Sequence, residues 1–191
     1  MNSIDVLEPL FAPLAALQNL IEAFDNRGIV IGGVAVSILG KPRLTADADA
    51  MFLLPAKKIP ELIEQASREG IVPRIPDVEE FARRNRVVLL RHEESGVDID
   101  ISLGLLPFEV EAVERSREYD TGSLTVRLPT PEDLIILKAV AHRPKDMTDI
   151  ATVLNAHDDL DTERIIFWVQ QFAELLEIPE VLTELEDIIR R

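Results

Sequence analysis

The sequence predicts an α+β fold, in which a mixed β-sheet with flanking helices is followed by a purely helical C-terminal part. Between residues 28 and 128, short runs rich in β-branched residues alternate with segments of helical periodicity. Residues 86–92 and 97–103 are two such runs separated by a short turn, which indicates a hairpin. After Thr130 only helical periodicity remains. We therefore expect an α/β core with an N-terminal helix over 1–128 and a helical region packed on it over 129–191.

The first part of the chain predicts a helix followed by a strand–helix–strand unit. Residues 5–26 place their apolar side chains on one helical face. Proline suits a first helical turn, so the main helix is expected to begin near Pro13, and Gly28 is expected to end it. The following elements are a strand over 29–31, a helix over 34–39, an acidic strand that ends before Pro55, and an exposed helix over 59–68.

The middle of the chain is expected to supply the sheet edge. Residues 71–75 are predicted as an edge strand because Pro73 cannot donate a hydrogen bond in the centre of a sheet. Asp77 is expected to cap the next helix, with Glu80 as its partner in a capping box. The remaining elements are a helix over 77–85, the hairpin, a helix over 107–117, a strand over 123–128, and helices over 131–142, 146–156, 161–175 and 179–190.

Two further signals support the helical region. Thr130 and Pro131, followed by two acids, are typical of a helix N-terminus. Trp168 and Phe172 are four residues apart on one helix, a spacing that predicts a place in the core.

Composition narrows the class of protein. No apolar run approaches the ~20 residues of a membrane span, so no membrane association is expected. The N-terminal residues are acidic where an export signal is basic, and the absence of cysteine fits a cytoplasmic protein. With no cysteine and three scattered histidines, any metal is expected to have oxygen ligands, as Mg²⁺ or Mn²⁺ do.

The charge of the chain bears on its partners. Thirty-five acidic and twenty basic residues give a formal charge of −15, which disfavours binding to bulk nucleic acid. A local basic patch or a basic protein partner remains compatible with this charge. The sequence has one basic cluster, which is either a solvated face or a contact for a nucleotide or acceptor: Arg83, Arg84, Arg86 and Arg91.

Asp47 and Asp49 are the first candidates for chemistry. Residues two apart on a strand project from the same face, about 6–7 Å apart along the chain. Such a pair also occurs on solvated strands, but here the flanking residues are apolar, and a buried carboxylate without a partner costs several kcal/mol. The pair therefore indicates a bound cation.

Gly32 and Gly33 lie where a strand gives way to a helix. Glycine lets backbone N–H groups approach a phosphate without a Cβ in the way. The same pair also suits a tight turn with close helix–strand packing. It therefore indicates a phosphate site only in combination with the acids that follow.

Asp98 and Asp100 repeat the acidic pattern on a second apolar strand. If the two acidic strands are neighbours in one sheet, a third carboxylate joins Asp47 and Asp49. Three carboxylates on adjacent strands can hold two Mg²⁺ ions, the arrangement used for in-line phosphoryl chemistry. Periodicity alone does not decide whether Asp98 belongs to this site or is a solvated residue.

Three segments together resemble a known superfamily. They are GGVAVSILGKPRLTADADAMF (32–52), VDIDISLGLLPFE (97–109) and TPEDLIILKAVAHRPKDMTDIATVL (130–154). In this order they resemble the nucleotidyltransferase superfamily typified by DNA polymerase β, over about residues 29–154. The closer likeness is to the AbiEii/AbiGii toxin-like and the minimal nucleotidyltransferases.

The resemblance implies a function and a site. It implies Mg²⁺-dependent (or Mn²⁺-dependent) transfer of a nucleotidyl group from an NTP to an acceptor, which is an RNA 3′ end, a protein or a small molecule. It also implies a possible toxin role with a cognate antitoxin. The implied catalytic and metal-binding residues are Asp47, Asp49 and Asp100. The implied nucleotide-binding residues are Gly32, Gly33, Arg43, Thr45, Lys138, Asp146 and Asp149. Arg143 and Lys145 occupy matching places in the third segment.

Simpler interpretations stay open. Lys138 suits a helix surface from which its ammonium reaches solvent, and Asp146 and Asp149 suit the first turn of a helix. Gly33 stands where many superfamily members have serine, so a hydroxyl contact to phosphate is missing. A catalytically inactive binding or interaction module of the same fold is therefore the alternative function.

Overall fold

The computed structural model describes residues 6–190. The start of the predicted segment 5–26 and the first acid of the N-terminal stretch, Asp5, lie outside the described residues, as does residue 191. Across residues 6–190, no helix combines the length and the apolar character needed to span a membrane.

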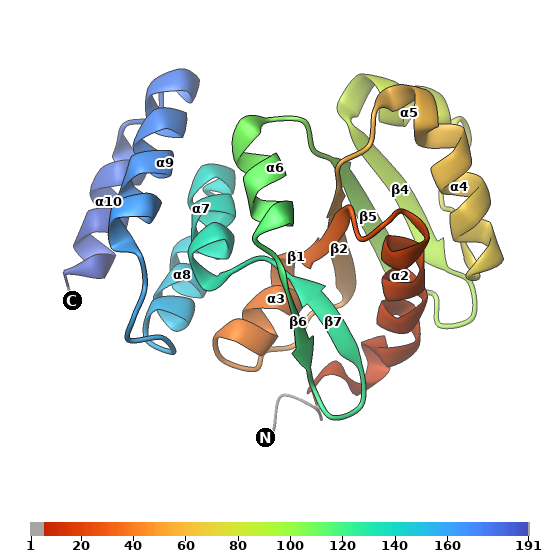
Figure 1. Cartoon of the computed structure of the whole chain (residues 1–191), viewed down its shortest axis with the longest axis horizontal. Coiled ribbons are helices and arrows are strands. Elements are labelled where there is room, and N and C mark those ends of the chain that lie inside the picture. Colours follow the sequence, from red (N-terminus) through yellow and green to blue (C-terminus); the bar gives the residue numbers. More distant parts are fainter. Residues whose placement is uncertain (1–5, 191) are drawn as a thin grey trace.

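A five-stranded mixed sheet forms the centre of the described chain (Figure 1). Its strands are β1 (Gly28–Ile31), β2 (Asp47–Phe52), β3 (Ile71–Pro73), β4 (Val87–His92) and β5 (Asp98–Leu103). Their order is β1-β2-β5-β4-β3, and only β2 and β5 are parallel. The predicted mixed sheet and the β4–β5 hairpin are confirmed, and Pro73 does lie in an edge strand.

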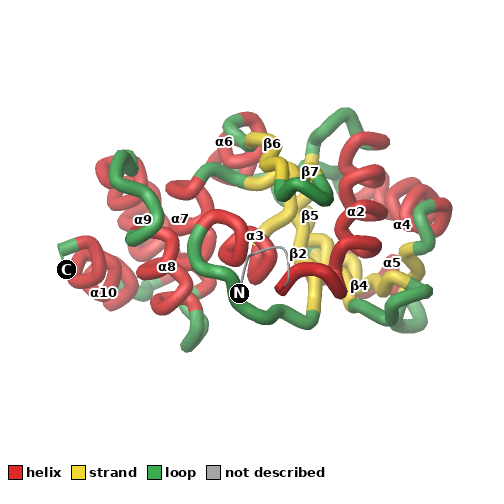
Figure 2. The backbone as a smooth tube through the Cα atoms, turned by 90° about the horizontal axis from the view of Figure 1, so that it is seen from below, coloured by secondary structure: helices red, strands yellow, loops and turns green. Residues whose placement is uncertain are grey.

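Helices cover both faces of this sheet. Figure 2 shows α2 and α4 on one side of the strands and α3 with α7, α8, α9 and α10 on the other. The helical elements of the first half are η1 (Glu8–Leu10), α2 (Phe11–Ala23), α3 (Gly32–Leu39), η2 (Ala56–Lys58), α4 (Ile59–Arg68), α5 (Val78–Asn85) and α6 (Pro107–Glu114). Alternate residues of β2 and β5 fill the core between these layers, because Ala48, Ala50, Ile99 and Ile101 are fully buried.

The helical region follows the prediction closely. Its helices are α7 (Pro131–Ala141), α8 (Asp146–Leu154), α9 (Thr162–Leu176) and α10 (Glu180–Ile189). Thr130 caps α7, since its hydroxyl oxygen accepts a 3.3 Å hydrogen bond from the Asp133 N–H. Trp168 and Phe172 pack on Phe108 of α6, with ring centroids 5.3 and 5.6 Å away. Both are only partly buried, so they lie against the core and not, as predicted, within it. The boundary between 128 and 129 stays a prediction.

Residues 107–128 differ from the expectation. The predicted helix over 107–117 ends at Glu114, and Arg117 begins β6 (Arg117–Asp120). This strand pairs with β7 (Thr125–Leu128), the predicted last strand, in a separate two-stranded sheet. In β6 only Tyr119 is partly buried, so the strand lacks the apolar alternation that identifies a half-buried strand.

Two predicted helix ends are wrong. Gly28 lies inside β1 and does not end α2; Asp25 and Asn26, both with φ of 56°, turn the chain instead. Asp77 does precede α5, but it has a φ of 54° and its side chain makes no capping hydrogen bond within the described chain. The capping box with Glu80 is therefore not formed.

Candidate functional site

The four acids of β2 and β5 lie side by side in the sheet. Parallel pairing places Asp47 opposite Asp98 and Asp49 opposite Asp100. The adjacency on which the third carboxylate depended is therefore confirmed. All four side chains project from the face opposite the buried alanines and isoleucines, because side chains alternate along a strand.

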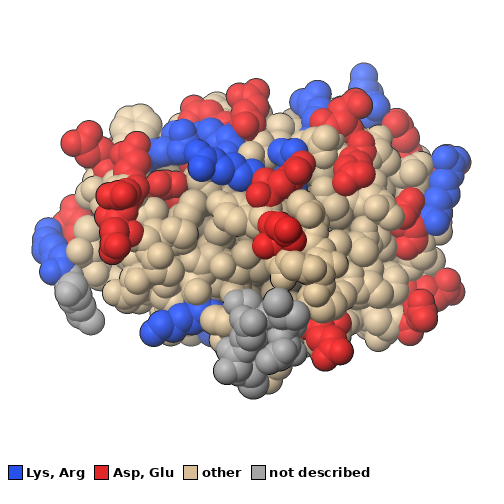
Figure 3. Space-filling view, turned by 60° about the horizontal axis from the view of Figure 1, so that its bottom comes forward, with Lys and Arg blue, Asp and Glu red and all other residues tan. Residues whose placement is uncertain are grey.

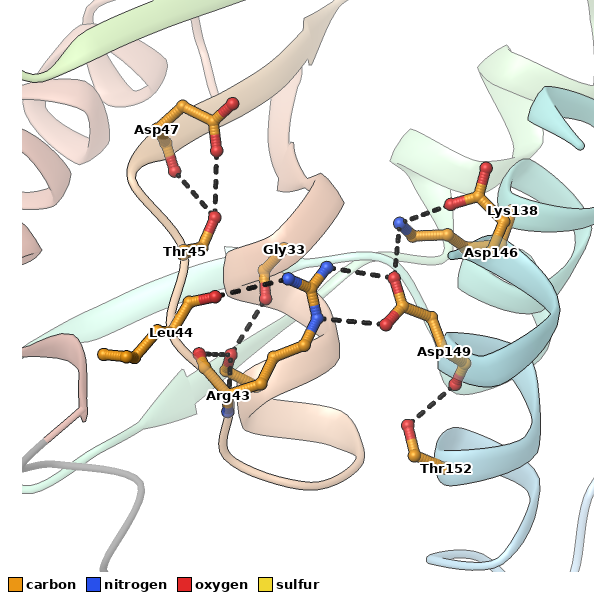
Figure 4. Close-up of polar contacts among 10 residues, drawn as sticks. Gly33, Arg43, Leu44, Thr45, Asp47, Lys138, Asp146, Asp149 and Thr152 are labelled. Atoms are coloured by element: carbon orange, nitrogen blue, oxygen red, sulfur yellow. Dashed lines mark hydrogen bonds and ion pairs between the residues drawn. The ribbon is translucent and has the colours of Figure 1, made fainter. Parts of the chain in front are cut away.

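Asp47 and Asp49 lack a cationic partner within residues 6–190. Among the described residues, neither carboxylate forms an ion pair with lysine or arginine. Asp47 Oδ1 accepts a 2.9 Å hydrogen bond from the Thr45 hydroxyl (Figure 4). Two adjacent carboxylates of this kind repel each other and favour the binding of a cation.

The glycine pair makes room for these acids. Gly32 has a φ of +67°, and a Cβ added there would lie 2.0 Å from Asp49 Oδ2. A Cβ on Gly33 would lie 2.5 Å from the Thr45 hydroxyl oxygen. The first turn of α3 therefore contacts the acidic strand so closely that neither position has space for a side chain. Phosphate contact by these glycines stays a prediction.

Asp98 and Asp100 differ from the first pair because an arginine bridges them. Arg74 Nη1 lies 2.8 Å from Asp98 Oδ2, and Arg74 Nη2 lies 2.8 Å from Asp100 Oδ1. Arg91 Nε adds a second contact to Asp98, at 2.7 Å. Sequence analysis missed Arg74, which follows the short edge strand β3 in no recognisable motif.

A network of opposite charges forms the facing wall, on α7, α8 and the loop before β2. Arg43 binds Asp149 through two contacts of 3.0 Å, from Nε and Nη2. Lys138 Nζ donates to Asp146 Oδ1 at 2.8 Å and to Asp149 Oδ2 at 2.9 Å (Figure 4). Asp146 and Asp149 are almost fully buried. The structure thus brings these four predicted residues together, and it does not place Lys138 free on a helix surface.

The loop that carries Arg43 and Thr45 is tied to α3. The Ser37 hydroxyl lies 2.9 Å from the carbonyl oxygens of both Gly33 and Arg43. Because Ser37 is buried, these contacts fix the loop against the glycine turn. Ser37 is a second residue that sequence analysis missed, since one serine inside an apolar helix carries no distinctive signal.

A cleft of about 810 Å³ separates the acidic strand from the facing wall. It is lined by Asp47 and Asp49 on one side and by Lys138, Arg143 and Lys145 on the other, with Gly33, Arg43 and Thr45 between. Within residues 6–190, Arg143 and Lys145 take part in no ion pair, in contrast to Lys138. The cleft therefore presents unpaired acids opposite unpaired bases, a distribution suited to a metal-bound anion.

Burial changes the acidity of the cleft carboxyls. The pKa of Asp49 is raised, mainly because burial disfavours the charged form and further because Asp47 and Asp100 are nearby; Arg143 and Lys138 oppose this. The pKa of Asp100 is also raised by burial, against the opposing effect of Arg74. The pKa of Asp98 is lowered, chiefly by its hydrogen bond from Arg91.

The raised pKa of Asp49 predicts a pH-dependent effect of Asp49→Asn on stability. Because the folded protein holds this proton more tightly than the unfolded chain, stability falls as pH rises from the ordinary value of 3.8 through the folded pKa. The variant lacks this loss. Its free energy of unfolding should match that of the wild type near pH 4 and exceed it at pH 7.

Urea unfolding with EDTA present, at a series of pH values from about 4 to about 7, measures this difference. An equal gain in the free energy of unfolding at both ends of the pH range would contradict a raised pKa of Asp49. The expected gain comes only from removing a carboxylate that is ionised at neutral pH.

The donor set fits Mg²⁺ at the first acid pair. Asp47 and Asp49 supply the hard oxygen ligands that Mg²⁺ prefers and lack a competing cation. In the part of the chain that the structure describes, no three acidic or histidine side chains already surround one metal position. Asp100 lies beside the pair but is held by Arg74. Asp47, Asp49 and Asp100 as metal ligands stay a prediction, with Asp100 the ligand that needs rearrangement.

The basic cluster of the sequence lies elsewhere. Arg83 and Arg84 pair with glutamates on their own helix, and Arg86 donates to the Leu103 carbonyl. Arg91 alone contacts one of the four acids, Asp98. These contacts favour the solvated interpretation for Arg83 and Arg84.

The five-stranded mixed sheet with its acidic strands beside a glycine-led helix is a nucleotidyltransferase-like fold, as two comparisons with known proteins show. The chain belongs to the family described as nucleotidyltransferases of unknown function (DUF6036), which residues 8–177 match. It is also similar in structure to an antigenic nucleotidyltransferase-like protein from Paracoccidioides brasiliensis, with a TM-score of 0.55. The two are 14% identical, over 94% of this chain and 93% of that chain, so this likeness concerns the fold. None of the curated proteins matches this chain.

Proposed function

We propose that this protein is a Mg²⁺-dependent nucleotidyltransferase that moves an NMP group from an NTP to an acceptor. The observation that carries the proposal is the cleft itself. Unpaired Asp47 and Asp49, with Asp100 in register beside them, face Arg143 and Lys145 across about 810 Å³. Membership of a nucleotidyltransferase family supports the same reaction class.

Each wall of the cleft has its own role in this proposal. Asp47 and Asp49 would hold Mg²⁺, joined by Asp100, and the bound ion supplies charge neutralisation and a more acidic attacking hydroxyl. Arg143 and Lys145 bind the triphosphate, because in the described part of the chain neither forms an ion pair with an acid. Lys138 and Arg43, held by Asp146 and Asp149, position the wall from which these bases project. Gly32 and Gly33 let α3 begin directly against Asp49 and Thr45, and without a Cβ their N–H groups can be approached by a phosphate.

The charge of the surface bears on the acceptor. On the face drawn in Figure 3, acidic side chains are scattered widely and basic ones gather in a few small groups. A net charge of −15 makes extended contact with RNA unfavourable. Within the proposed reaction this favours a basic protein or a small molecule over a long RNA, while an RNA 3′ end that enters the cleft alone remains compatible.

The AbiEii-like character belongs to this proposal as well. It is supported by the motif order in the sequence and by the position of Lys138, Asp146 and Asp149 in one network. If the protein is the toxin of a toxin–antitoxin pair, its expression should arrest growth, and Asp49→Asn should relieve the arrest. A cognate antitoxin would then be expected.

Two observations favour an inactive binding module. Arg74 already contacts both Asp98 and Asp100, and Gly33 lacks the hydroxyl found in many superfamily members. Calorimetric titration with Mg²⁺ and a non-hydrolysable NTP separates the two functions. Micromolar binding supports the enzyme, whereas no heat with any of the four nucleotides supports the module.

The direct test uses NTPs labelled at either the α or the γ phosphate. The protein is incubated with Mg²⁺, each NTP and fractionated acceptors: RNA, protein and small molecules. Nucleotidyl transfer places the α label, and not the γ label, on the acceptor. Transfer of the γ label alone would identify a phosphoryl transferase, and transfer of neither label to any fraction would contradict the proposal.

A further inference from the structure

Arg74 is a cation built into the site of the third carboxylate. One residue beyond β3, its backbone N–H donates a 3.2 Å hydrogen bond to the Leu89 carbonyl oxygen on β4. From this fixed base its two terminal nitrogens each lie 2.8 Å from one acid, Asp98 or Asp100. Only 19% of the side chain is exposed, so the guanidinium is held against β5 and not extended into solvent.

The acids of β5 are therefore already paired with cationic side chains, whereas those of β2 are not. Asp47 and Asp49 carry two negative charges that no lysine or arginine of the described chain pairs with, and one divalent ion balances them. The two acids of β5 are already matched by Arg74 and Arg91. A second divalent ion would enter beside positively charged groups and would compete with a guanidinium for the same carboxylate oxygens.

We propose that Arg74 is a positioning residue that occupies Asp100 in the free protein, so that only one divalent cation binds until Arg74 releases this carboxylate. The inference rests on the proposed function and concerns the order in which the site fills. A nucleoside triphosphate brings the negative charge that a second divalent ion requires. The site is thus complete only with its substrate bound.

The test measures Mn²⁺ binding to the full-length protein without nucleotide, by electron paramagnetic resonance of free Mn²⁺ and by calorimetry. The wild type should bind one ion. Arg74→Gln should bind a second ion, with an affinity about ten-fold or more above any second site of the wild type. Arg74→Lys keeps the charge and should return to one ion, although it loses the forked contact.

Arg91→Gln is the matched control. The substitution removes one positive charge from the same cluster. Because Arg91 contacts Asp98 and not Asp100, Asp100 stays paired with Arg74 in this variant. This variant should bind one ion, as the wild type does. A second ion in Arg91→Gln would show that the total charge, and not the contact to Asp100, limits binding, and would overturn the proposal.

Asp100→Asn gives a reciprocal test that does not depend on how Arg74→Gln folds. Because Asp100 becomes a ligand only after Arg74 releases it, this variant should bind a single Mn²⁺ both without nucleotide and with a non-hydrolysable NTP, whereas the wild type should take up a second ion with the nucleotide. A second ion in Asp100→Asn with the nucleotide would overturn the proposal, as would unchanged stoichiometry in a folded Arg74→Gln. Either of these two results would contradict the role of Arg74 but leave the proposed function intact, provided that Asp47→Asn abolishes Mn²⁺ binding. Failure of the wild type to bind Mn²⁺, even with a non-hydrolysable NTP, would overturn both.

Discussion

Replacing Asp49 by asparagine is expected to lower nucleotidyl transfer by at least about a hundred-fold. Asp49 lies between the glycine turn of α3 and Asp100 of β5, and its carboxylate has no cation of its own in the described chain. Asparagine preserves its size but not the charge that would hold Mg²⁺ against the triphosphate. The loss should appear in transfer of the α label at saturating NTP, with the fold retained.

Asp159→Asn provides the matched control for this variant. Asp159 is an exposed acid outside the cleft, so its replacement changes the net charge equally and should leave transfer within about two-fold of the wild type. Equal activity in Asp49→Asn and the wild type would mean that the acid pair does not carry the chemistry. Equal loss in both variants would implicate the net charge of the protein instead.

Asp133→Ala is expected to cost about 3–5 kcal/mol in the free energy of unfolding. Asp133 is fully buried in the first turn of α7. Its Oδ1 lies 2.9 Å from Arg164 of α9, and its Oδ2 lies 3.2 Å from Arg115 at the end of α6. Alanine would leave both guanidiniums without this partner, and the 15%-exposed Arg164 side chain cannot turn fully into solvent.

Arg115→Ala tests whether the buried charge is responsible. The Arg115 side chain is 43% exposed, so its removal leaves Asp133 still paired with Arg164 and should cost only about 1 kcal/mol. Urea unfolding of both variants gives the comparison. Similar losses in the two would show that the network acts through general packing and not through the buried carboxylate.

The sequence predicted the cleft in part because strand periodicity is a local property. The alternation around Asp47, Asp49 and Asp100 identifies one face of each strand without knowledge of the fold. Whether these strands are neighbours is not local, since two α-helices, a 3₁₀ helix and two strands separate β2 from β5 in the chain. From the sequence, the third carboxylate was therefore expected only if the two acidic strands were neighbours. The parallel pairing of β2 and β5 shows that they are.

Ion pairs across the fold could not be predicted for the same reason. Arg74 reaches Asp100 because its backbone pairs with Leu89 of β4, which lies opposite Asp100 in the register with β5. Arg43 reaches Asp149 across 106 positions of the chain. No periodicity or spacing encodes such partners, and an arginine in a short loop has the same local signal whether it is solvated or buried.

The wrong predictions at the helix ends have a different cause, which is the use of residue preferences for local conformation. Glycine and capping residues predict boundaries by frequency, yet Asp25 and Asn26 adopt the left-handed conformation without glycine. Gly28 is required instead by packing, because a Cβ there would lie 3.1 Å from the Phe52 ring. At this position glycine therefore serves a tertiary contact, which the local preference of glycine for helix ends does not predict.

The two walls of the cleft also emerge from the ribosome at different times. The acids and the glycine turn are complete by Asp100, but Lys138, Arg143 and Lys145 follow about forty residues later. A nascent or prematurely terminated chain can thus display the acidic strands without the bases that face them. The basic wall of the cleft is therefore complete only once residue 145 has been added to the chain.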